Sequence, residues 1–313
     1  MMTRYLVTGG AGFIGSNIVR ALSDKGKQVR ILDNFHTGKR ENIRGLNRAI
    51  EVMEGDFTND ETIKKAVKDV DIIIHQGAIP SVPKSIQDPI QTNHANITGT
   101  LKLLHAAAGD NVKRFVYASS SSAYGFNQTL PKQENMPGSP MSPYAVSKYT
   151  GEHYCKVFHD IFGLETISLR YFNVFGPRQS PQSKYAAVIP AFIEAILNDQ
   201  SPVIYGDGTQ SRDFTYVEDI VSANLLAAEA PKLQGEVINI GTGSQIVLND
   251  LVNDINAILG KNIPAKHTTA RQGDVKHSLA DIRLAEKLIG YRPSTSFHDG
   301  LKHTINWMKN QLH

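Results

Sequence analysis

Short apolar runs alternate with segments of helical periodicity along the first half of the chain. The runs cover residues 5–9, 28–33, 50–56, 71–76, 114–120 and 166–172, and the helical segments cover 14–24, 60–68, 91–108 and 144–161. Strands that are apolar throughout and alternate with helices are typical of a parallel sheet covered on both faces. The pattern therefore predicts an α/β fold with a doubly wound, Rossmann-type parallel sheet and right-handed crossovers.

The alternation becomes less regular after residue 173. Helical patterns follow at 185–198, 217–229, 248–259, 281–289 and 297–311, with a strand that runs into a turn at 201–208 and a strand at 236–241. We expect residues 1–173 to form a cofactor-binding domain, to which some later segments return. Residues 174–313 are expected to form mainly a smaller α/β substrate domain.

Composition argues against several classes of protein. The net charge is only +3, and no run of five basic residues occurs, which argues against a nucleic-acid tail or a membrane-surface helix. No apolar run approaches the ~20 residues of a membrane span, and the N-terminus lacks the pattern of a signal peptide. Cys155 is the only cysteine, so an internal disulfide is impossible. We expect a cytoplasmic protein with neither nucleic acid nor membrane as a partner.

The first predicted turn has the features of a dinucleotide site. In YLVTGGAGFIGSNIV, Gly9, Gly12 and Gly15 follow a G-x-x-G-x-x-G spacing between a strand and a helix. Glycines let backbone N–H groups approach a pyrophosphate, and the N-terminus of the next helix attracts its negative charge. A purely structural glycine turn is the alternative, and the position between the first strand and the first helix favours the dinucleotide.

Two carboxylates follow later strands of the predicted sheet. Asp33 ends the second strand, where a carboxylate accepts hydrogen bonds from the ribose hydroxyls of NAD and repels the 2′-phosphate of NADP. Because no Arg follows Asp33 directly, we expect NAD as the cofactor. Asp56 follows the third strand and is a candidate adenine contact, with a turn or cap role as the alternative.

A single Tyr-x-x-x-Lys spacing occurs in the chain, at Tyr144 and Lys148 within SPYAVSKY. Ser142 and Pro143 predict the start of a helix, so Tyr144 and Lys148 share one helix face near its N-terminus. A nicotinamide is expected nearby, and its positive charge together with Lys148 favours the phenolate of Tyr144. The phenolate could accept a proton from a substrate hydroxyl.

The run Ser119 to Ser122 lies in ASSSSAYG, at the end of the fifth predicted strand. Exposed hydroxyls at the carboxyl end of a strand suit the binding of a substrate hydroxyl. A polar loop without a function is the alternative.

Together these motifs resemble the extended short-chain dehydrogenase/reductase family. The resemblance rests on TGGAGFIG, Asp33, SSSSAYG and SPYAVSK, and it covers nearly the whole chain. Further matching stretches are HQGAIPSVPKSIQDP, RYFNVFGPRQ, YGDGTQSRDFTYVEDI and ARQGDVKHSLADI. Within the family the chain is similar to nucleotide-sugar 4-epimerases, and HQGAIPSVPKSIQDP resembles the UDP-N-acetylglucosamine 4-epimerases.

The resemblance implies a role for each matching residue. Tyr144 matches the general base, Lys148 its partner, and Ser120 the catalytic Ser or Thr, extended by Ser121 and Ser122. The implied cofactor-binding residues are Gly9, Gly12, Phe13, Ile14, Gly15, Asp33, Asn34, Asp56, Phe57, Gln76, Gly77, Ala78, Asn96, Tyr144, Lys148 and Tyr171. The implied substrate-binding residues are Ser81, Lys84, Ser120, Asn173, Val188, Tyr205, Arg212, Arg271, Asp274 and Ser278. No metal is implied.

The resemblance further implies a UDP-N-acetylglucosamine/UDP-glucose 4-epimerase, which inverts C4 through a transient 4-keto sugar with tightly bound NAD. Arg212 and Arg271 match ligands of the diphosphate, and Asp274 matches a ligand of the uridine ribose. Ser278 stands where relatives restricted to unsubstituted hexoses carry Tyr, which predicts room for an N-acetyl group; a helix cap is the alternative. A homodimer packed through 91–108 and 144–161 is also implied.

The chain departs from the family pattern at Gly77, where Ala is expected, and at Ala123, where Thr or Val is common. Both changes leave the identity of the sugar in the substrate undetermined, and a UDP-glucuronate 4-epimerase stays an alternative. A nucleotide-sugar dehydratase is disfavoured, because dehydratase-like relatives carry Asp-Glu where this chain has Ser121-Ser122. A decarboxylase is disfavoured less firmly on similar grounds. A non-catalytic NAD-binding module could lose the Tyr-Lys pair, whereas this chain has both residues.

Overall fold

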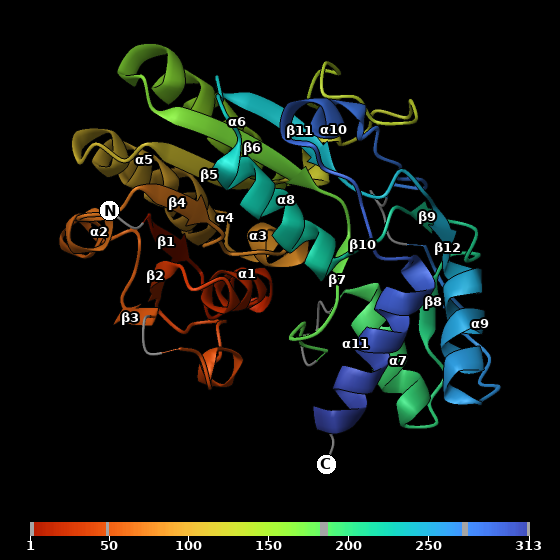
Figure 1. The fold of residues 1–313 in the computed structure, drawn as a ribbon. Coiled ribbons are helices and arrows are strands. Elements are labelled where there is room, and N and C mark those ends of the chain that lie inside the picture. The colour runs from red at the N-terminus through yellow and green to blue at the C-terminus, as the bar shows by residue number, and fades with distance from the viewer. Residues whose placement is uncertain (1–2, 48–49, 182–186, 271–274, 312–313) are drawn as a thin grey trace.

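The central sheet of the computed structural model is parallel and doubly wound. The structure describes residues 3–47, 50–181, 187–270 and 275–311, and within them seven strands pair in the order β11-β6-β5-β4-β1-β2-β3 (Figure 1). The order in which strands are added to the sheet switches sides between β1 and β4, and at such a switch point a ligand crevice is expected beyond the carboxyl ends of the two strands. The predicted fold class is confirmed. The strands are β1 (Arg4–Thr8), β2 (Gln28–Asp33), β3 (Ile50–Glu54), β4 (Ile72–His75), β5 (Arg114–Ser120), β6 (Glu165–Tyr171) and β11 (Glu236–Ile240).

Helices cover both faces of this sheet, which explains why its inner strands are apolar on both sides. On one face, α1 (Phe13–Asp24), α8 (Val217–Glu229) and α10 (Arg283–Ile289) pack in a core that includes Ile18 and Ile220. On the other face, α2 (Asp60–Val67), α5 (Thr100–Gly109) and α6 (Pro143–Phe162) pack in a core that includes Leu103 and Phe158.

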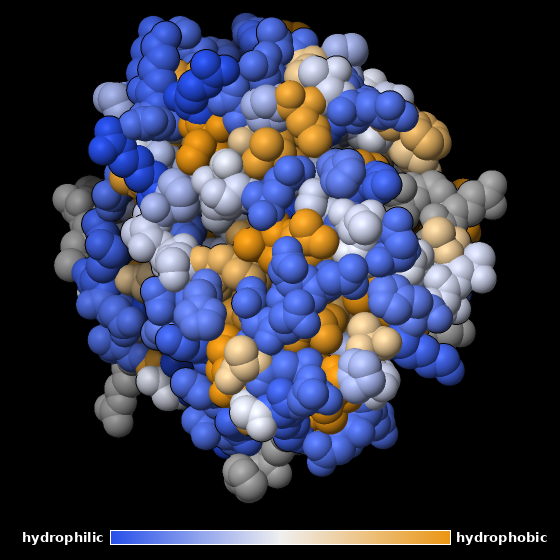
Figure 2. Space-filling view, turned by 90° about the vertical axis from the view of Figure 1, so that its right-hand side faces the viewer, coloured by the Kyte–Doolittle hydropathy of each residue, from blue (hydrophilic) through white to orange (hydrophobic). Residues whose placement is uncertain are grey.

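Three further helices stand apart from the sheet, at the lower right of Figure 1. They are α7 (Val188–Leu197), α9 (Leu248–Leu259) and α11 (Phe297–Gln311), which share a core around Phe192, Leu251 and Leu301. This part of the protein also contains three two-stranded sheets. They pair β7 (Val174–Phe175) with β10 (Thr215–Tyr216), β9 (Ser211–Arg212) with β12 (Ile246–Val247), and β8 (Val203–Tyr205) with β13 (Lys266–Thr268). The face that carries α9 is mostly hydrophilic, with small separate hydrophobic patches (Figure 2).

The structure corrects three element predictions. The segment 91–108, expected as one helix, consists of α4 (Pro89–Asn93), a π-helical turn (His94–Gly99) and α5. The helix expected at 281–289 begins at Arg283, and the strand expected at 50–56 ends at Glu54. Helix α3 (Val82–Gln87) and the 3-10 helices Arg40–Ile43 and Ser121–Tyr124 were not predicted, since such short segments show little periodicity. Among the described helices, none has both the length and the apolar character needed to cross a membrane.

Candidate functional site

The glycine turn lies where the loops after β1 and β4 meet. Gly9 has a φ of +65°, and a Cβ on it would lie 2.9 Å from the Cα of Gly77. A Cβ on Gly15 would lie 2.1 Å from the carbonyl oxygen of Gly9. Both glycines are therefore required by the close approach of three pieces of backbone.

Gly77, the departure noted in the sequence, has a local explanation. A Cβ at this position would lie 2.8 Å from Cε1 of the Phe57 ring, so the neighbouring aromatic ring excludes Ala unless it moves. Phe57 in turn packs edge-on against His75, with ring centroids 5.2 Å apart.

The N-terminus of α1 faces this crevice without a side-chain cap. Gly12 occupies the N-cap position, and no acidic residue lies in the first turn that begins at Phe13 and Ile14. Uncapped N–H groups at the positive end of a helix dipole suit a pyrophosphate. The predicted cradle for the dinucleotide is thus present in the backbone.

Asp33 is buried at the end of β2, beside the glycine turn. Its Oδ2 accepts a hydrogen bond from the Ala11 N–H at 2.9 Å, and its Oδ1 accepts one from the Phe35 N–H at 2.8 Å. A Cβ on Gly38 would lie 2.8 Å from Oδ1, so glycine keeps that side of the carboxylate free of a side chain. The carboxylate is fixed in orientation and keeps space for a ribose.

Asp56 has the turn role that the sequence left as the alternative. Its Oδ1 accepts hydrogen bonds from the N–H and the hydroxyl of Thr58, and its Oδ2 accepts one from Asn34 at 2.9 Å. Burial raises the pKa of Asp56, but these hydrogen bonds outweigh it and lower that pKa below its ordinary value. The predicted cofactor residues Asn34 and Asp56 are therefore joined at one edge of the crevice.

Gln76 and Tyr171 are also joined, across the sheet. The Gln76 amide donates to the Tyr171 hydroxyl at 2.9 Å and to Oδ1 of Asn224 at 3.1 Å, and Asn224 donates to the same hydroxyl at 2.8 Å. Burial raises the pKa of Tyr171, so this phenol stays neutral. Asn96 holds the loop after β4 at Ile79, next to Ala78. Its side-chain oxygen accepts the Ile79 N–H, and its side-chain nitrogen donates to the Ile79 carbonyl.

His75 lies behind the loop that contains Gly77 and was not predicted as a site residue. It is fully buried, and its ring contacts the hydroxyl of Thr8 at 2.6 Å and that of Thr100 at 3.0 Å. The Thr8 hydroxyl in turn accepts the Gly77 N–H at 3.1 Å. Burial, with a smaller effect of the Lys148 charge, lowers the pKa of His75 to about 3.

We expect His75 to make the fold sensitive to acid. Its folded pKa of about 3 lies below the ordinary 6.5, so the unfolded chain binds the extra proton and stability falls as pH drops through this window. Between about pH 6.5 and about pH 4 the loss should be roughly 3 kcal/mol. Urea unfolding at both pH values measures it. His75→Gln should lose less stability on acidification, whereas the exposed His105→Gln should behave as the parent; equal losses in the parent and His75→Gln would contradict the assignment.

Tyr144 lies in the first turn of α6, which begins as predicted at Pro143 with Ser142 as N-cap. The Ser142 hydroxyl accepts the Ala145 N–H at 3.1 Å. Burial raises the pKa of Tyr144, and a side-chain hydrogen bond with Ser120 partly offsets this rise. The structure therefore brings the predicted phenol and the predicted serine hydroxyl into contact.

The four serines after β5 have different environments. Ser122 donates both its N–H, at 3.2 Å, and its hydroxyl, at 2.9 Å, to the Ser120 oxygen. Because Ser120 accepts these bonds, its own proton can point to Tyr144 or to a ligand. Ser121 opens the 3-10 helix and is half-buried. Ser119 is buried instead and donates to Glu152, so it belongs to the core.

Lys148 lies one helical turn after Tyr144 and is buried. Its ammonium donates to the Ala118 carbonyl at 2.8 Å and lies 5.1 Å from the centre of the Tyr117 ring. Burial lowers the pKa of Lys148 to about 8. The group is thus a desolvated cation beside the end of β5, where Ser120 lies.

Three of the predicted substrate residues converge around the segment Ser211–Asp213. The Asn173 amide donates to the Asp213 carbonyl at 3.1 Å, and the Ser278 N–H donates to the Ser211 carbonyl at 3.1 Å. Arg212, between these two positions, donates to the Lys276 carbonyl at 3.0 Å. Since helix α10 begins only at Arg283, the helix-cap reading of Ser278 is wrong.

The remaining predicted substrate residues lie on separate elements. Ser81 caps α3, where its hydroxyl accepts the Lys84 N–H at 3.2 Å. Val188 opens α7, and Tyr205 ends β8 with 39% of its surface exposed. The predictions for Arg271 and Asp274 lie outside the described residues.

Asp213 is a structural residue of this region that the sequence reasoning missed. It is fully buried and accepts hydrogen bonds from the Thr242 and Gly243 N–H groups and from the Ala280 N–H. Burial raises the pKa of Asp213, and these bonds oppose the rise. Its position in SRDFTYVED was the available signal, but only the fold shows which distant N–H groups it binds.

Comparison with known proteins now decides the family. The model of the NAD dependent epimerase/dehydratase family matches residues 5–241. This chain belongs to that family. The resemblance seen in the sequence is therefore confirmed, and the glycine cradle, the uncapped helix N-terminus and Asp33 fit the NAD that the family uses.

Solved structures of the epimerase family superpose along the whole chain. A UDP-N-acetylglucosamine 4-epimerase from Methanobrevibacter ruminantium, in complex with UDP-N-acetylmuramic acid, is 44% identical at a TM-score of 0.95, with 99% of this chain and 100% of that chain covered. A UDP-glucose 4-epimerase from Thermotoga maritima, with UDP-glucose, is 37% identical at 0.94, with the same coverage. A UDP-glucuronic acid 4-epimerase from Bacillus cereus, with UDP-glucuronic acid and NAD, is 36% identical at 0.92, again with 99% and 100% covered. The chain is an NAD-dependent epimerase, an isomerase, and its cofactor is NAD.

Proposed function

We propose that the protein is a UDP-sugar 4-epimerase whose substrates include UDP-N-acetylglucosamine and UDP-glucose. The observation that carries this proposal is the contact of Tyr144 with Ser120, with Lys148 one turn away, at the carboxyl ends of the strands beside the glycine cradle. Relatives with these sugar nucleotides in their names cover the whole chain. In this proposal residues 1–173 mainly hold NAD and residues 174–313 mainly hold the sugar nucleotide.

The chain's own residues supply binding and proton transfer. Bound NAD supplies an acceptor and donor of the C4 hydrogen, so the sugar passes through a 4-keto form. Tyr144 accepts the proton of the O4 hydroxyl and later returns it, and Ser120 holds O4 by a hydrogen bond. Because burial raises the pKa of Tyr144, its phenolate needs positive charge nearby, and in this proposal Lys148, one turn further along α6, would supply part of it.

The sugar nucleotide is proposed to lie between residues 120–124, called the serine turn below, and the segment around Ser211–Asp213. Arg212 and Arg271 would bind the diphosphate, since guanidinium groups suit phosphate oxygens. Asn173 and Asp274 would contact the sugar nucleotide, and Ser278 would lie beside the C2 group. The backbone of Ser278 is held on both sides, by Ser211 at its N–H and by Gln245 at its carbonyl.

A homodimer is proposed through α6 and the helical segment 89–109. Apolar side chains on these helices are exposed: Ile90 by 79%, Val146 by 44%, Val157 by 43% and Ile161 by 70%. Burial of such side chains against a second copy would remove them from water. The cytoplasmic location stays a prediction.

Product analysis with a panel of UDP-sugars tests the proposed function. We expect UDP-N-acetylglucosamine and UDP-glucose to be converted to their C4 epimers with unchanged mass and without added NAD. Exclusive conversion of UDP-glucuronate would support the glucuronate alternative, loss of water would show a dehydratase, and loss of carbon dioxide a decarboxylase. No conversion of any sugar, by protein that holds NAD, would contradict the proposal.

A further inference from the structure

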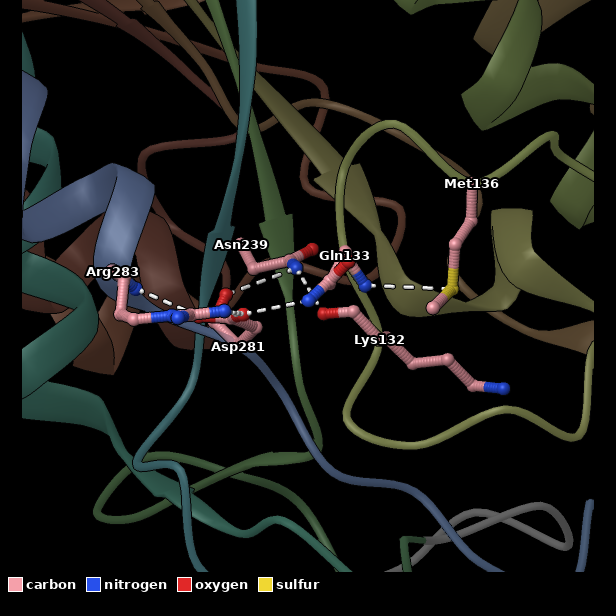
Figure 3. Close-up of polar contacts among 6 residues, drawn as sticks. All are labelled: Lys132, Gln133, Met136, Asn239, Asp281 and Arg283. Atoms are coloured by element: carbon pink, nitrogen blue, oxygen red, sulfur yellow. Dashed lines mark hydrogen bonds and ion pairs between the residues drawn. The ribbon is translucent and has the colours of Figure 1, made fainter.

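Asn239 lies fully buried near the end of β11, the edge strand of the large sheet. Its side-chain oxygen accepts a hydrogen bond from the Tyr124 hydroxyl at 2.7 Å. Its side-chain nitrogen donates to the carbonyls of Lys132 at 2.9 Å and Asp281 at 3.2 Å (Figure 3). One amide group therefore joins three segments that are far apart in the sequence.

The first of these segments is the serine turn. Tyr124 is the last residue of the 3-10 helix Ser121–Tyr124, which directly follows Ser120. Its ring is buried and lies under the guanidinium of Arg170, 4.5 Å from the ring centre. Arg170 forms a buried ion pair with Glu152 of α6 at 2.7 Å. The contacts of Tyr124 thus extend to the helix that carries Tyr144.

The other two segments form a strand-like pair. The Lys132 N–H donates to the Leu279 carbonyl at 2.8 Å, and the Asp281 N–H donates to the Lys132 carbonyl at 2.9 Å. In Figure 3 the Lys132 side chain points away from Asn239, so its backbone carbonyl makes the contact. Gln133 adds a bond to the Asp281 carboxylate at 3.2 Å. The segment 279–281 is therefore fixed to the loop that follows the serine turn.

Ser278 directly precedes this pair. Its N–H is bound by the Ser211 carbonyl at 3.1 Å, and the Ala280 N–H is bound by the Asp213 carboxylate at 3.1 Å. The stretch 276–281 is consequently attached on one side to the Ser211–Asp213 segment and on the other to Lys132 and Asn239. A shift at Asn239 would move Ser278 relative to Ser120.

We propose that Asn239 is a positioning residue, which sets the distance between the serine turn and the substrate segment 276–281. The inference rests on the proposed function, in which Ser120 and Ser278 face the same UDP-sugar. Asn239 touches neither residue and acts through Tyr124, Lys132 and Asp281. Because segment 276–281 contacts the sugar in this proposal, Asn239 thereby fixes the position of the sugar relative to Tyr144.

The chemistry of the three contacts selects an amide. The Tyr124 hydroxyl needs an acceptor, and the two carbonyls need donors, so one side chain must supply both. An Asp carboxylate of the same shape would face two carbonyl oxygens with no proton to donate. A Leu side chain would remove the acceptor of the Tyr124 hydroxyl and one donor to each carbonyl. The Lys132 carbonyl would keep the Asp281 N–H, whereas the buried Asp281 carbonyl would lose its side-chain donor, which is costly in a protein interior.

The Asn239→Asp variant tests the role, with Asn256→Asp as matched control. Asn256 is another buried amide that donates to two carbonyls, of Val252 and Ile263, and accepts the Ile263 N–H, but it lies on α9 away from the serine turn. For Asn239→Asp we expect kcat with a UDP-sugar to fall roughly 10²-fold, as a small misplacement of reacting groups can cause. NAD content per chain and the Kd for UDP, which lacks the hexose, should stay within about threefold, because neither ligand spans the two segments.

Tyr124→Phe provides a second variant that removes a single hydroxyl and keeps the ring. It should also lower kcat, by a smaller factor than Asn239→Asp does, and again NAD and UDP binding should be retained. Asn256→Asp should lower the unfolding midpoint without lowering kcat per NAD-loaded chain. If Asn239→Asp and Tyr124→Phe kept parental kcat, or if UDP affinity fell as much as kcat, the positioning role would be wrong. A parent that epimerises no UDP-sugar overturns the proposed function and the positioning role together.

Discussion

Replacing Tyr144 with Phe is expected to remove most turnover while the protein keeps its NAD. The change deletes one hydroxyl, and that hydroxyl is the group in contact with Ser120 at the carboxyl end of β5. A general acid–base group contributes about 10²–10⁴-fold to a rate, so kcat should fall by about that factor. NAD binding should survive, because the glycine cradle and Asp33 are formed by other elements.

The measurement is steady-state turnover of UDP-glucose and UDP-N-acetylglucosamine, together with the NAD released on denaturation. Tyr154→Phe is a suitable control, since Tyr154 lies on the same helix and packs against the core on the α2 and α5 side. The control should keep near-parental activity. Turnover by Tyr144→Phe within a few-fold of the parent would mean that another group moves the O4 proton.

Replacing Ser278 with Tyr is expected to reduce turnover of N-acetylated UDP-sugars far more than that of UDP-glucose. The backbone at Ser278 is fixed by Ser211 and Gln245, so a larger side chain cannot retreat by a shift of the main chain. A phenol ring in the space for the C2 substituent rejects the larger group by steric clash. The loss in kcat/KM for UDP-N-acetylglucosamine should exceed the loss for UDP-glucose by about 10²-fold, or about 2.7 kcal/mol.

The ratio of kcat/KM values for the two sugars, on the parent and the variant, measures this effect. Ser201→Tyr makes the same chemical change at an exposed position between α7 and β8, and it should leave the ratio unchanged. An equal loss for both sugars in Ser278→Tyr would show that the position does not select at C2. A parent that does not use UDP-N-acetylglucosamine would show that the preferred substrate is a different UDP-sugar.

Helix α6 carries both Tyr144 of the proposed active site and the exposed apolar side chains of the proposed dimer surface. Val146 lies two residues after Tyr144, whereas Val157 and Ile161 lie near the C-terminal end of the helix. The proposed dimer contact would therefore extend along α6, including the end that carries Tyr144. The buried pair of Glu152 with Arg170 attaches the same helix to β6.

Local sequence determined the sheet, its main helices and the residues of the cofactor cradle. Gly12 and Gly15 depend on short-range geometry, since a Cβ on either would lie close to the Gly9 carbonyl oxygen, whereas Gly9 also lies against Gly77 from the loop after β4. Likewise, Ser142 and Pro143 set the start of α6, and this start places Tyr144 and Lys148 on one face. The start of α6 thus follows from a hydrogen bond between residues that are neighbours in the sequence.

The tertiary structure decided the features that depend on contacts between distant segments. The run of four serines by itself did not separate Ser119 from Ser120, and only the family resemblance singled out Ser120. The structure gives the reason, because neighbouring residues of a strand face opposite sides: Ser119 points into the core and Ser120 points to Tyr144. Sequence reasoning also gave no reason for Gly77, where the Phe57 ring leaves no room for a Cβ. Asn239 is the clearest case: its three partners come from three separate segments, so its polarity is specified only when the fold brings a hydroxyl and two carbonyls to one buried point.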